Sequence, residues 1–527
     1  MAQAADVPLS HGLKEAMSRS LRVIDRAFCS SMEASIEFLK ILRRRGRVGR
    51  ALRAMHEVGF LSRFLPEFGR ISLLIQHDLY HHYTVDEHTL RAVDALDELD
   101  TSQDKQRQHF RDAFNEVEDP ALLYFSVLLH DIGKGQGSGH VARGVDISAR
   151  ICERMQLSAE ATAVVLLLVK YHTTMAQISQ RRDLREAQVA TEFASQMGSI
   201  DALNMLTLLT YGDLNGVGPG VWSDWKGLLL WELYERTRVV LAGGHDDLLA
   251  SMDSDGRGKF AHLKEEVMNL LEGKIPLSEI ERHFALLPER YARIVDAQVV
   301  ANHLRLIEQL KADVLSTSWK QRGKSATELT VCTLDRHGLF ADLAGTMAAQ
   351  GVEILGAELN TREDGLALDV FVIRETATHH ALPEYKWSQV EQALGAAIKG
   401  EMDVAATVER WRTKSAPRRS KPLPARAKRQ PHVVGDNDVA QGATVFEVRA
   451  IDEPGFAYKI ASALGALNLD IVCARVTTEK SDALDVFYVT DATGAKLPEA
   501  TLRSVEIELT RRLSLNETLT PGETPKT

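Results

Sequence analysis

The chain has 527 residues, 44% of them hydrophobic and 26% charged, a profile typical of a globular protein with roughly three or four domains. Its 63 basic and 73 acidic residues leave a net charge of −10, which argues against a chain that is basic throughout to neutralise nucleic-acid phosphates. The longest strongly apolar run, Ala161–Val169, is too short to span a bilayer.

Targeting and redox signals favour the cytoplasm. The N-terminus lacks the basic-then-apolar layout of a signal peptide. The four cysteines are scattered without a C-x-x-C pair, which predicts reduced, mostly buried thiols and neither a disulfide frame nor a zinc ribbon. We therefore expect a cytoplasmic protein with no membrane and no nucleic-acid partner.

The first three hundred or so residues carry apolar side chains at helical spacing, and Gly and Pro mostly fall between the apolar runs. The runs are Leu21–Leu42, Ala51–Phe64, His88–Leu99, Ala121–His130, Ala161–His172, Ala202–Leu209 and Leu228–Leu241. A further stretch from Pro276 to Leu315 continues the pattern. This half of the chain is therefore predicted to be all-α.

The pattern changes near Thr327, where Thr327–Thr333 alternates like a strand and a helical segment and more strands follow. The same order recurs later in the chain. The matched pairs are Asp335–Phe340 with Asp452–Ala457, Leu368–Val372 with Leu484–Tyr488, and the 23-position spacings Gly338 to Thr361 and Gly455 to Thr478. These matches predict a tandem duplication.

A basic stretch, Arg412–Arg429, separates the two copies and contains three prolines and no acid. Its composition cannot build a core, so it predicts a mobile linker, with a patch for an anionic partner as the alternative.

The segment Leu128–Gly135 joins an apolar helix to His130, Asp131 and a glycine-rich loop. Imidazole nitrogen and carboxylate oxygen suit Mn, Fe, Zn or Mg ions, and an aspartate can bridge two of them. Four more such residues lie near predicted helix ends: His88, His140, His172 and Asp213. We expect these side chains to converge on a common cavity.

The order His88, His130-Asp131, Asp213 resembles that of the HD-domain metal-dependent phosphohydrolases, and His140 and His172 resemble the members that hold two metals. Longer phrases resemble the bacterial PII uridylyltransferase/uridylyl-removing enzyme family. They are Tyr83–Thr89, His130–Gly135, Gln180–Asp183 and His283–Tyr291, and the duplicated C-terminal units resemble that family's paired ACT domains. The resemblance extends from about residue 20 to 515.

The resemblance implies a multidomain fold, with an all-α HD-type helical domain followed by two α+β, ferredoxin-like ACT domains of βαββαβ order. The expected divisions are a helical N-terminal segment (1–70), the HD phosphohydrolase domain (71–245), a helical connector (246–325), ACT domain 1 (326–400), a basic linker (401–442), ACT domain 2 (443–518) and a tail (519–527).

The implied reaction is hydrolysis of the phosphodiester that joins UMP to a tyrosine of the PII signalling protein. The implied cofactor is a divalent metal, Mg or Mn first, with Fe or Zn as alternatives. The implied first-metal ligands are His88, His130, Asp131 and Asp213, with Asp131 bridging, and His140 and His172 would bind a second ion. A mononuclear site would not need the last two.

Three cations complete the predicted catalytic set around Asp131. Lys134 could offset phosphate charge or orient the attacking water. Arg181 and Arg182 could grip the phosphate, because a guanidinium fork fits phosphate oxygens. A solvated charge run is the alternative for these two arginines.

Each C-terminal unit has an Asp-x-x-Gly turn after its first strand, Asp335/Gly338 and Asp452/Gly455. The glycine lets the backbone approach a ligand, the next helix offers free N–H groups to a carboxylate, and the aspartate could receive an ammonium group. A helix cap and a simple turn are the alternative. The resemblance implies glutamine as the allosteric effector and is compatible with a homo-oligomer formed through the ACT domains.

The sequence departs from the family in one respect. The family normally begins with a nucleotidyltransferase domain marked by a Gly-Ser turn and an Asp-x-Asp pair. Residues 1–70 lack this signature, and Asp253–Asp255 and Asp436–Asp438 lie in polar loops without the Gly-Ser turn. We therefore expect no uridylyltransferase activity, whether the chain is a natural short form or a fragment. The competing functions are an HD hydrolase of a small nucleotide such as guanosine tetraphosphate, and a non-catalytic, glutamine-responsive PII-binding regulator.

Overall fold

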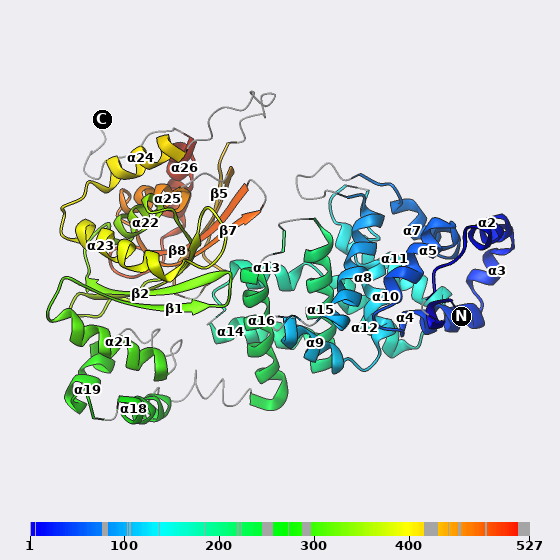
Figure 1. Cartoon of the computed structure of the whole chain (residues 1–527), viewed down its shortest axis with the longest axis horizontal. Helices are drawn as coiled ribbons and strands as arrows, with labels where there is room; N and C mark the ends of the chain where they lie inside the picture. The colour runs from blue at the N-terminus through cyan, green and yellow to red at the C-terminus, as the bar shows by residue number, and fades with distance from the viewer. Residues whose placement is uncertain are drawn as a thin grey trace. The chain divides into compact units, whose positions relative to one another are not determined.

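The computed structural model describes most of the chain and divides it into two compact units. The described residues are 2–5, 7–75, 83–102, 104, 107–135, 137–184, 186–218, 221–222, 224–244, 257–271, 273–286, 297–415, 430–440, 442–451, 455–479 and 482–514. The first unit comprises 1–180 and 187–246, and the second comprises 181–186 and 247–527. Each unit has its own architecture (Figure 1).

The first unit is helical, as predicted. Its elements are α1 (Ala2–Ala5), α2 (His11–Arg19), η1 (Ser20–Val23), α3 (Arg26–Cys29), α4 (Met32–Leu42), α5 (Val48–Glu57), α6 (Phe60–Phe64), α7 (Pro66–Ile71), α8 (Val85–Thr101), α9 (Gln108–Asn115), α10 (Pro120–Leu129), α11 (His140–Arg154), α12 (Ala159–Tyr171), α13 (Thr174–Arg181), α14 (Ala187–Met197), α15 (Ile200–Gly216), α16 (Asp224–Val239) and η3 (Val240–Gly244).

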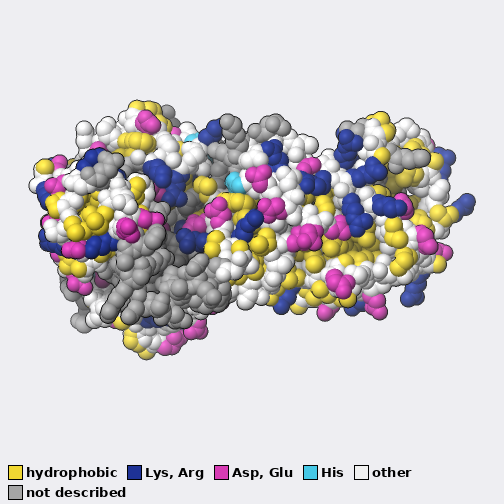
Figure 2. Space-filling model, turned by 90° about the horizontal axis from the view of Figure 1, so that it is seen from below, with side chains coloured by type: hydrophobic (Ala, Val, Ile, Leu, Met, Phe, Trp, Pro, Cys, Tyr) yellow, Lys and Arg dark blue, Asp and Glu magenta, His cyan; other side chains and the backbone are white. Residues whose placement is uncertain are grey.

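Local sequence sets where the helices of this unit begin. The hydroxyls of Ser31, Ser158 and Ser199 accept hydrogen bonds from the backbone N–H groups of the first turns of α4, α12 and α15. Helix α10 begins at Pro120, whose missing N–H costs nothing at a first helical position. Almost every residue of α10 is buried, so it is a central helix of this core. On the face in Figure 2, acidic and basic side chains are interspersed over the helical unit.

The second unit combines helices with a sheet. Its elements are α18 (Arg257–Leu271), α19 (Leu277–Leu286), α21 (Ala297–Leu310), β1 (Leu315–Arg322), β2 (Ala326–Leu334), α22 (Leu339–Ala349), β3 (Val352–Glu358), β4 (Leu366–Glu375), η4 (Glu384–Lys386), α23 (Trp387–Ile398), α24 (Val404–Ser415), β5 (His432–Asp436), β6 (Thr444–Ile451), α25 (Phe456–Gly465), β7 (Asp470–Glu479), β8 (Asp482–Thr490) and α26 (Glu499–Ser514).

The strands form one eight-stranded sheet in the order β1-β2-β4-β3-β7-β8-β6-β5, and the neighbours pair antiparallel. The two repeats meet where β3 pairs with β7, through Gly356 with Arg475, Ala357 with Ala474 and Glu358 with Cys473. We call this β3–β7 pairing the seam. Each half of the sheet contributes four strands, which confirms the predicted α+β class of the duplicated units.

The order of elements within each repeat differs from the predicted βαββαβ and is ββαββα. The strand beside the first predicted strand comes from the preceding segment, because β1 pairs with β2 and β5 pairs with β6. Consequently β1 lies inside the range 246–325 that the sequence assigns to a helical connector. The linker range 401–442 likewise contains α24 and β5. The basic residues between them, 416–429, lie outside the described residues.

The two faces of the sheet are covered differently. One face packs against α22 to α26 in a single core that runs through both repeats and includes Phe371 and Phe487 (Figure 1). On the other face of the first repeat, α21 covers Cys332 and Leu368. The corresponding face of the second repeat carries a smaller cluster that includes Cys473 and Tyr488.

Among the described residues no single helix is long and apolar enough to cross a membrane. Helices α12 and α13 reach the length and apolar composition of a membrane span only when taken together, and the pair is bent by 42°.

Candidate metal centre

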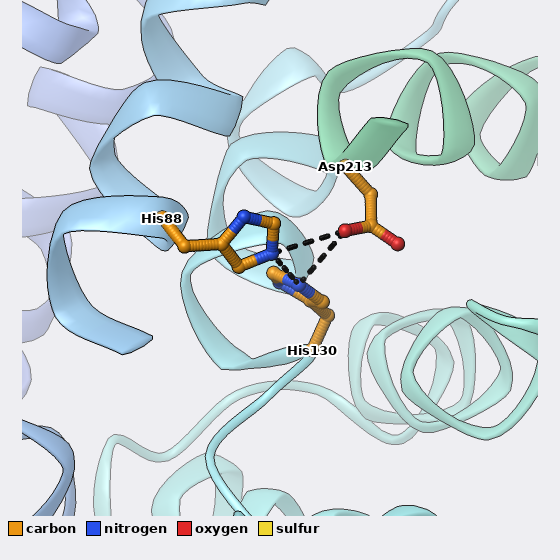
Figure 3. Close-up of side chains that lie close together, drawn as sticks. All are labelled: His88, His130 and Asp213. Atoms are coloured by element: carbon orange, nitrogen blue, oxygen red, sulfur yellow. Dashed lines mark hydrogen bonds and ion pairs between the residues drawn. The ribbon is translucent and has the colours of Figure 1, made fainter. Parts of the chain in front are cut away.

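Six of the predicted ligands gather into two adjacent groups of three in the helical unit. His88, His130 and Asp213 form one group (Figure 3), and Asp131, His140 and His172 form the other. Within each group the donor atoms all lie within 4.8 Å of one another. Three helices (α8, α11 and α15) and the C-terminal ends of two others (α10 and α12) supply them, so residues far apart in sequence meet at one place.

The first group is the tighter of the two. Nε2 of His88 lies 3.2 Å from Nε2 of His130 and 3.0 Å from Oδ1 of Asp213 (Figure 3). The distance from Nε2 of His130 to Oδ1 of Asp213 is 3.6 Å. Metal–ligand bonds of about 2.1 Å at roughly 90–110° place donor atoms about 3.0–3.4 Å apart. The spacing of this group therefore fits a single divalent cation.

Backbone contacts select the tautomers of two histidines. Nδ1 of His130 lies 2.7 Å from the Val127 carbonyl, and Nδ1 of His172 lies 2.7 Å from the Val169 carbonyl. A carbonyl oxygen can only accept, so Nδ1 must donate in both rings. These contacts leave Nε2 of each neutral ring with the lone pair that coordination of a metal would use.

Asp131 lies between the two groups. Its Oδ2 is 3.2 Å from His130 Nε2, and its Oδ1 is 3.8 Å from His172 Nε2. Oδ1 is buried without a hydrogen-bond donor. This arrangement suits a carboxylate that bridges two cations. Lys134 lies on the same turn, with Nζ 2.6 Å from Oδ2 of Asp131.

Buried opposite charges control protonation at the centre. Burial disfavours the charged form of His130, but the carboxylates of Asp131 and Asp213 outweigh it and raise its pKa to about 10. Burial and the neighbouring His130 lower the pKa of His172 to about 4. Burial alone would raise the pKa values of the two aspartates, but the charges around them hold both well below the ordinary range. The centre therefore presents anionic carboxylates, as a cation site needs.

Two glycines bring Asp213 to His88, and sequence reasoning missed them. A Cβ on Gly216 would lie 2.9 Å from the His88 carbonyl oxygen, and one on Gly212 would lie 2.8 Å from the Ala92 carbonyl oxygen. Real Cβ atoms do not approach backbone so closely, so only glycine lets α15 lie this near α8. The available signal was a pair of glycines four residues apart on either side of Asp213.

Gly133 likewise allows a close backbone approach, here between the loop after Asp131 and helix α11. A Cβ there would lie 2.1 Å from the His140 carbonyl oxygen and 2.5 Å from the Gly144 backbone nitrogen. The loop after Asp131 therefore packs directly on the first turns of α11, which places His140 beside the centre.

Two of the predicted catalytic residues belong to the other compact unit. Arg181 and Arg182 belong to the short segment that packs within the second unit. There Nη1 of Arg181 lies 3.4 Å from Oε2 of Glu447. The partner of Arg181 in this structure is thus a carboxylate of the second repeat, and its predicted contact with phosphate stays a prediction.

The predicted effector loops have the backbone expected of them. Gly338 and Gly455 are left-handed, with φ of 78° and 80°, and each immediately precedes a helix, α22 or α25. Oδ2 of the exposed Asp335 accepts a hydrogen bond of 2.8 Å from the hydroxyl of Thr361. Asp452 lies outside the described residues.

Comparison with known proteins supplies the family. An HD domain model matches residues 85–203, which includes five of the six clustered ligands. A second model, the uridylyltransferase GlnD third domain, matches residues 5–64. Over most of its length the chain is similar to members of the uridylyltransferase/uridylyl-removing enzyme family.

Three relatives share the description "bifunctional uridylyltransferase/uridylyl-removing enzyme". The Azospirillum brasilense protein is 34% identical over 502 residues, 94% of this chain and 52% of its own length. The Rhodospirillum rubrum protein is 33% identical over 470 residues (88% and 49%), and a Bradyrhizobium protein is 31% identical over 512 residues (94% and 52%). The chain thus spans about half the length of the curated relatives it matches. The HD domain supports assignment of the chain to the metal-dependent hydrolases.

Proposed function

We propose that the chain is a metal-dependent phosphodiester hydrolase that removes UMP from uridylylated PII protein. The observation that carries the proposal is the meeting of His88, His130, Asp131 and Asp213 at distances that fit a divalent cation. Similarity to uridylyl-removing relatives supports the choice of substrate. Magnesium or manganese is the proposed metal because carboxylates suit these ions, and the four imidazoles keep iron or zinc as alternatives.

The chain's own residues have distinct parts in this reaction. His88, His130 and Asp213 would hold one cation, and His140 and His172 would hold a second, with Asp131 shared between them. A bound cation would polarise a phosphoryl oxygen and acidify a water molecule. Lys134, held against Asp131 by an ion pair of 2.6 Å, neutralises part of the carboxylate charge that would otherwise repel the phosphate. Arg181 and Arg182 remain proposed phosphate contacts.

Transferase activity is not assigned to this chain. Of the two short Asp-x-Asp matches, Asp253–Asp255 lies outside the described residues. In the other, Oδ1 of Asp436 accepts hydrogen bonds from the backbone N–H groups of Asp438 and Val439. That carboxylate closes a local turn, which supports a structural role for the pair.

The decisive experiment is incubation of the Mn²⁺-loaded chain with uridylylated PII, followed by measurement of released UMP. We expect release that EDTA abolishes and added Mn²⁺ restores. Guanosine tetraphosphate is the competing substrate, and faster turnover of that nucleotide than of uridylylated PII would contradict the proposal. Metal analysis of the purified chain separates a hydrolase from a metal-free regulator.

We further propose that the paired ACT-like repeats bind glutamine and that this binding favours UMP removal. The support is the left-handed glycine that precedes α22 and α25, at helix starts where no described side chain caps the first turn, so that a carboxylate could bind there. Asp335 would receive the ammonium group. Titration calorimetry with glutamine should show saturable heat that Asp335→Ala weakens, and an absence of heat in folded protein would contradict glutamine sensing.

A further inference from the structure

The segment Arg181–Glu186 lies inside the stretch that the HD domain model matches, yet it packs within the second compact unit. It continues directly from helix α13, and α13 begins two residues after His172. A displacement of this segment therefore acts on the helix that follows a proposed metal ligand in the chain.

The segment packs on a row of side chains from three neighbouring strands of the second repeat. Val486 on β8 pairs with Glu447 on β6 and with Arg475 on β7, so these residues form one line across the sheet. Tyr488 lies two residues further along β8, on the same face. Arg475 also pairs with Gly356 of β3, so one end of the row is at the seam.

The contacts between the row and the segment are polar and mostly buried. The Tyr488 hydroxyl accepts a hydrogen bond of 2.7 Å from the Asp183 N–H and donates one of 3.0 Å to the Arg181 carbonyl. Nη2 of Arg475 lies 3.8 Å from Oδ1 of Asp183, and these side chains are 8% and 1% exposed. Leu184 is fully buried. Buried polar contacts of this kind define one position for the segment.

The first repeat does not offer the same row. When the duplicated motifs are aligned, three residues of the first repeat are equivalent to those of the row. Val372 is equivalent to Tyr488, Glu358 to Arg475 and Thr330 to Glu447. None of these can reproduce the contacts, and the same face of the first repeat is covered by α21 instead. The site for the segment is therefore a specialisation of the second repeat.

At its other end, α13 is anchored in the helical unit. Met175 is fully buried, and its sulfur lies 3.5 Å from the hydroxyl of Thr207. Thr207 lies on α15, the helix that carries Asp213. One short helix thus follows His172, contacts the Asp213 helix and continues into the segment held by Tyr488.

We propose that Arg181–Glu186 is a coupling segment through which the second repeat adjusts the metal centre, with Tyr488 and Arg475 as its positioning residues. The effector part of this inference rests on the proposed function. Ligand binding that shifts β7 against β3 displaces Arg475, and Arg475 displaces Asp183. Because α13 is only eight residues long, begins two residues after His172 and contacts α15 through Met175, the displacement is transmitted toward His172 and α15.

Hydrogen exchange on the full chain tests whether the Tyr488 contacts hold Arg181–Glu186 and helix α13 in place. Tyr488→Phe removes both hydroxyl hydrogen bonds and leaves the ring. We expect the backbone amides of 174–186 to exchange about fivefold faster or more. A factor of this size corresponds to the stability that is lost with one buried hydrogen bond. The matched control is Tyr458→Phe, which removes a hydroxyl from α25 on the opposite face of the same repeat and should leave 174–186 unchanged. Faster exchange confined to 181–186, with 174–180 unchanged, would overturn the coupling.

Hydrolysis of bis(4-nitrophenyl) phosphate by the Mn²⁺-loaded chain tests the functional part without PII. We expect Tyr488→Phe to keep its basal rate within about twofold and to lose at least half of the change that glutamine causes, whereas Tyr458→Phe keeps the full response. A full glutamine response in Tyr488→Phe refutes the coupling. If calorimetry shows that wild type binds no glutamine, the sensing part of the proposed function fails, and the exchange comparison alone decides the coupling.

Discussion

The close approach of α15 to α8 leads to a prediction for Gly216→Ala. The added Cβ would stand 2.9 Å from both the His88 carbonyl oxygen and the Ala92 backbone nitrogen. Both atoms belong to backbone within a helix, so neither can rotate away. Relief to an ordinary contact of about 3.5–4 Å requires the helices to separate by roughly 0.5–1 Å.

Two effects of the substitution oppose each other. Alanine gains up to about 1 kcal/mol of helix propensity over glycine. Overpacking costs about 1–3 kcal/mol, so a net loss of stability is expected. The shift also exceeds the roughly 0.2 Å tolerance of metal–ligand distances, because Asp213 is carried on α15 and His88 on α8. We therefore expect Mn²⁺ affinity to fall by about 10–100-fold.

Thermal unfolding and Mn²⁺ titration calorimetry measure the two consequences separately. Gly12→Ala is the matched control, because a Cβ at this position of helix α2 meets nothing within 4 Å. It should keep wild-type metal affinity and lose no stability. Wild-type Mn²⁺ affinity in Gly216→Ala would refute the idea that this helix contact sets the geometry of the centre.

Three further predictions concern charge. Asp131→Asn should abolish UMP release while circular dichroism shows unchanged helix content, and near-normal turnover would remove the case for a bridging carboxylate. Because the pKa of His130 is raised to about 10, Mn²⁺ binding at pH 7 must expel its proton. Affinity should therefore fall as the pH is lowered, and binding heats should differ between buffers of different ionisation enthalpy. Burial raises the pKa of Asp97 to about 6, despite its hydrogen bond from Tyr124. The folded state then loses stability as pH rises from about 4 to 6. Asp97→Asn should therefore remove this part of the pH dependence, as chemical denaturation of both proteins between pH 4 and 7 would measure.

The clustering of the candidate metal ligands could be predicted from sequence, because each is a residue type with specific chemistry near a helix end. His88, His130, Asp131 and Asp213 were identified by their order, and the structure brings them together. The glycines that set their spacing could not be identified in the same way. The function of Gly216 depends on the backbone of another helix, and its sequence neighbours carry no sign of that contact.

The fold could be predicted at the level of class but not of strand order. Strand β1 was missed because Leu315–Arg322 is mostly polar beyond its first residue and lies at an edge of the sheet. Edge strands bury little, so they lack the alternating pattern that identified Thr327–Thr333. The carboxylate partner of Arg181 was equally hidden, because Glu447 is distant in sequence.

The seam makes the two repeats dependent on each other. Burial and the negative charge of Asp335 raise the pKa of Asp470, so the loop of the first repeat acts electrostatically on the first residue of β7. A pocket at Asp335 would accordingly draw one wall from each half of the duplication. If the repeats bind glutamine as proposed, the first repeat expressed by itself would form only part of that site, and both copies would be needed for each binding event.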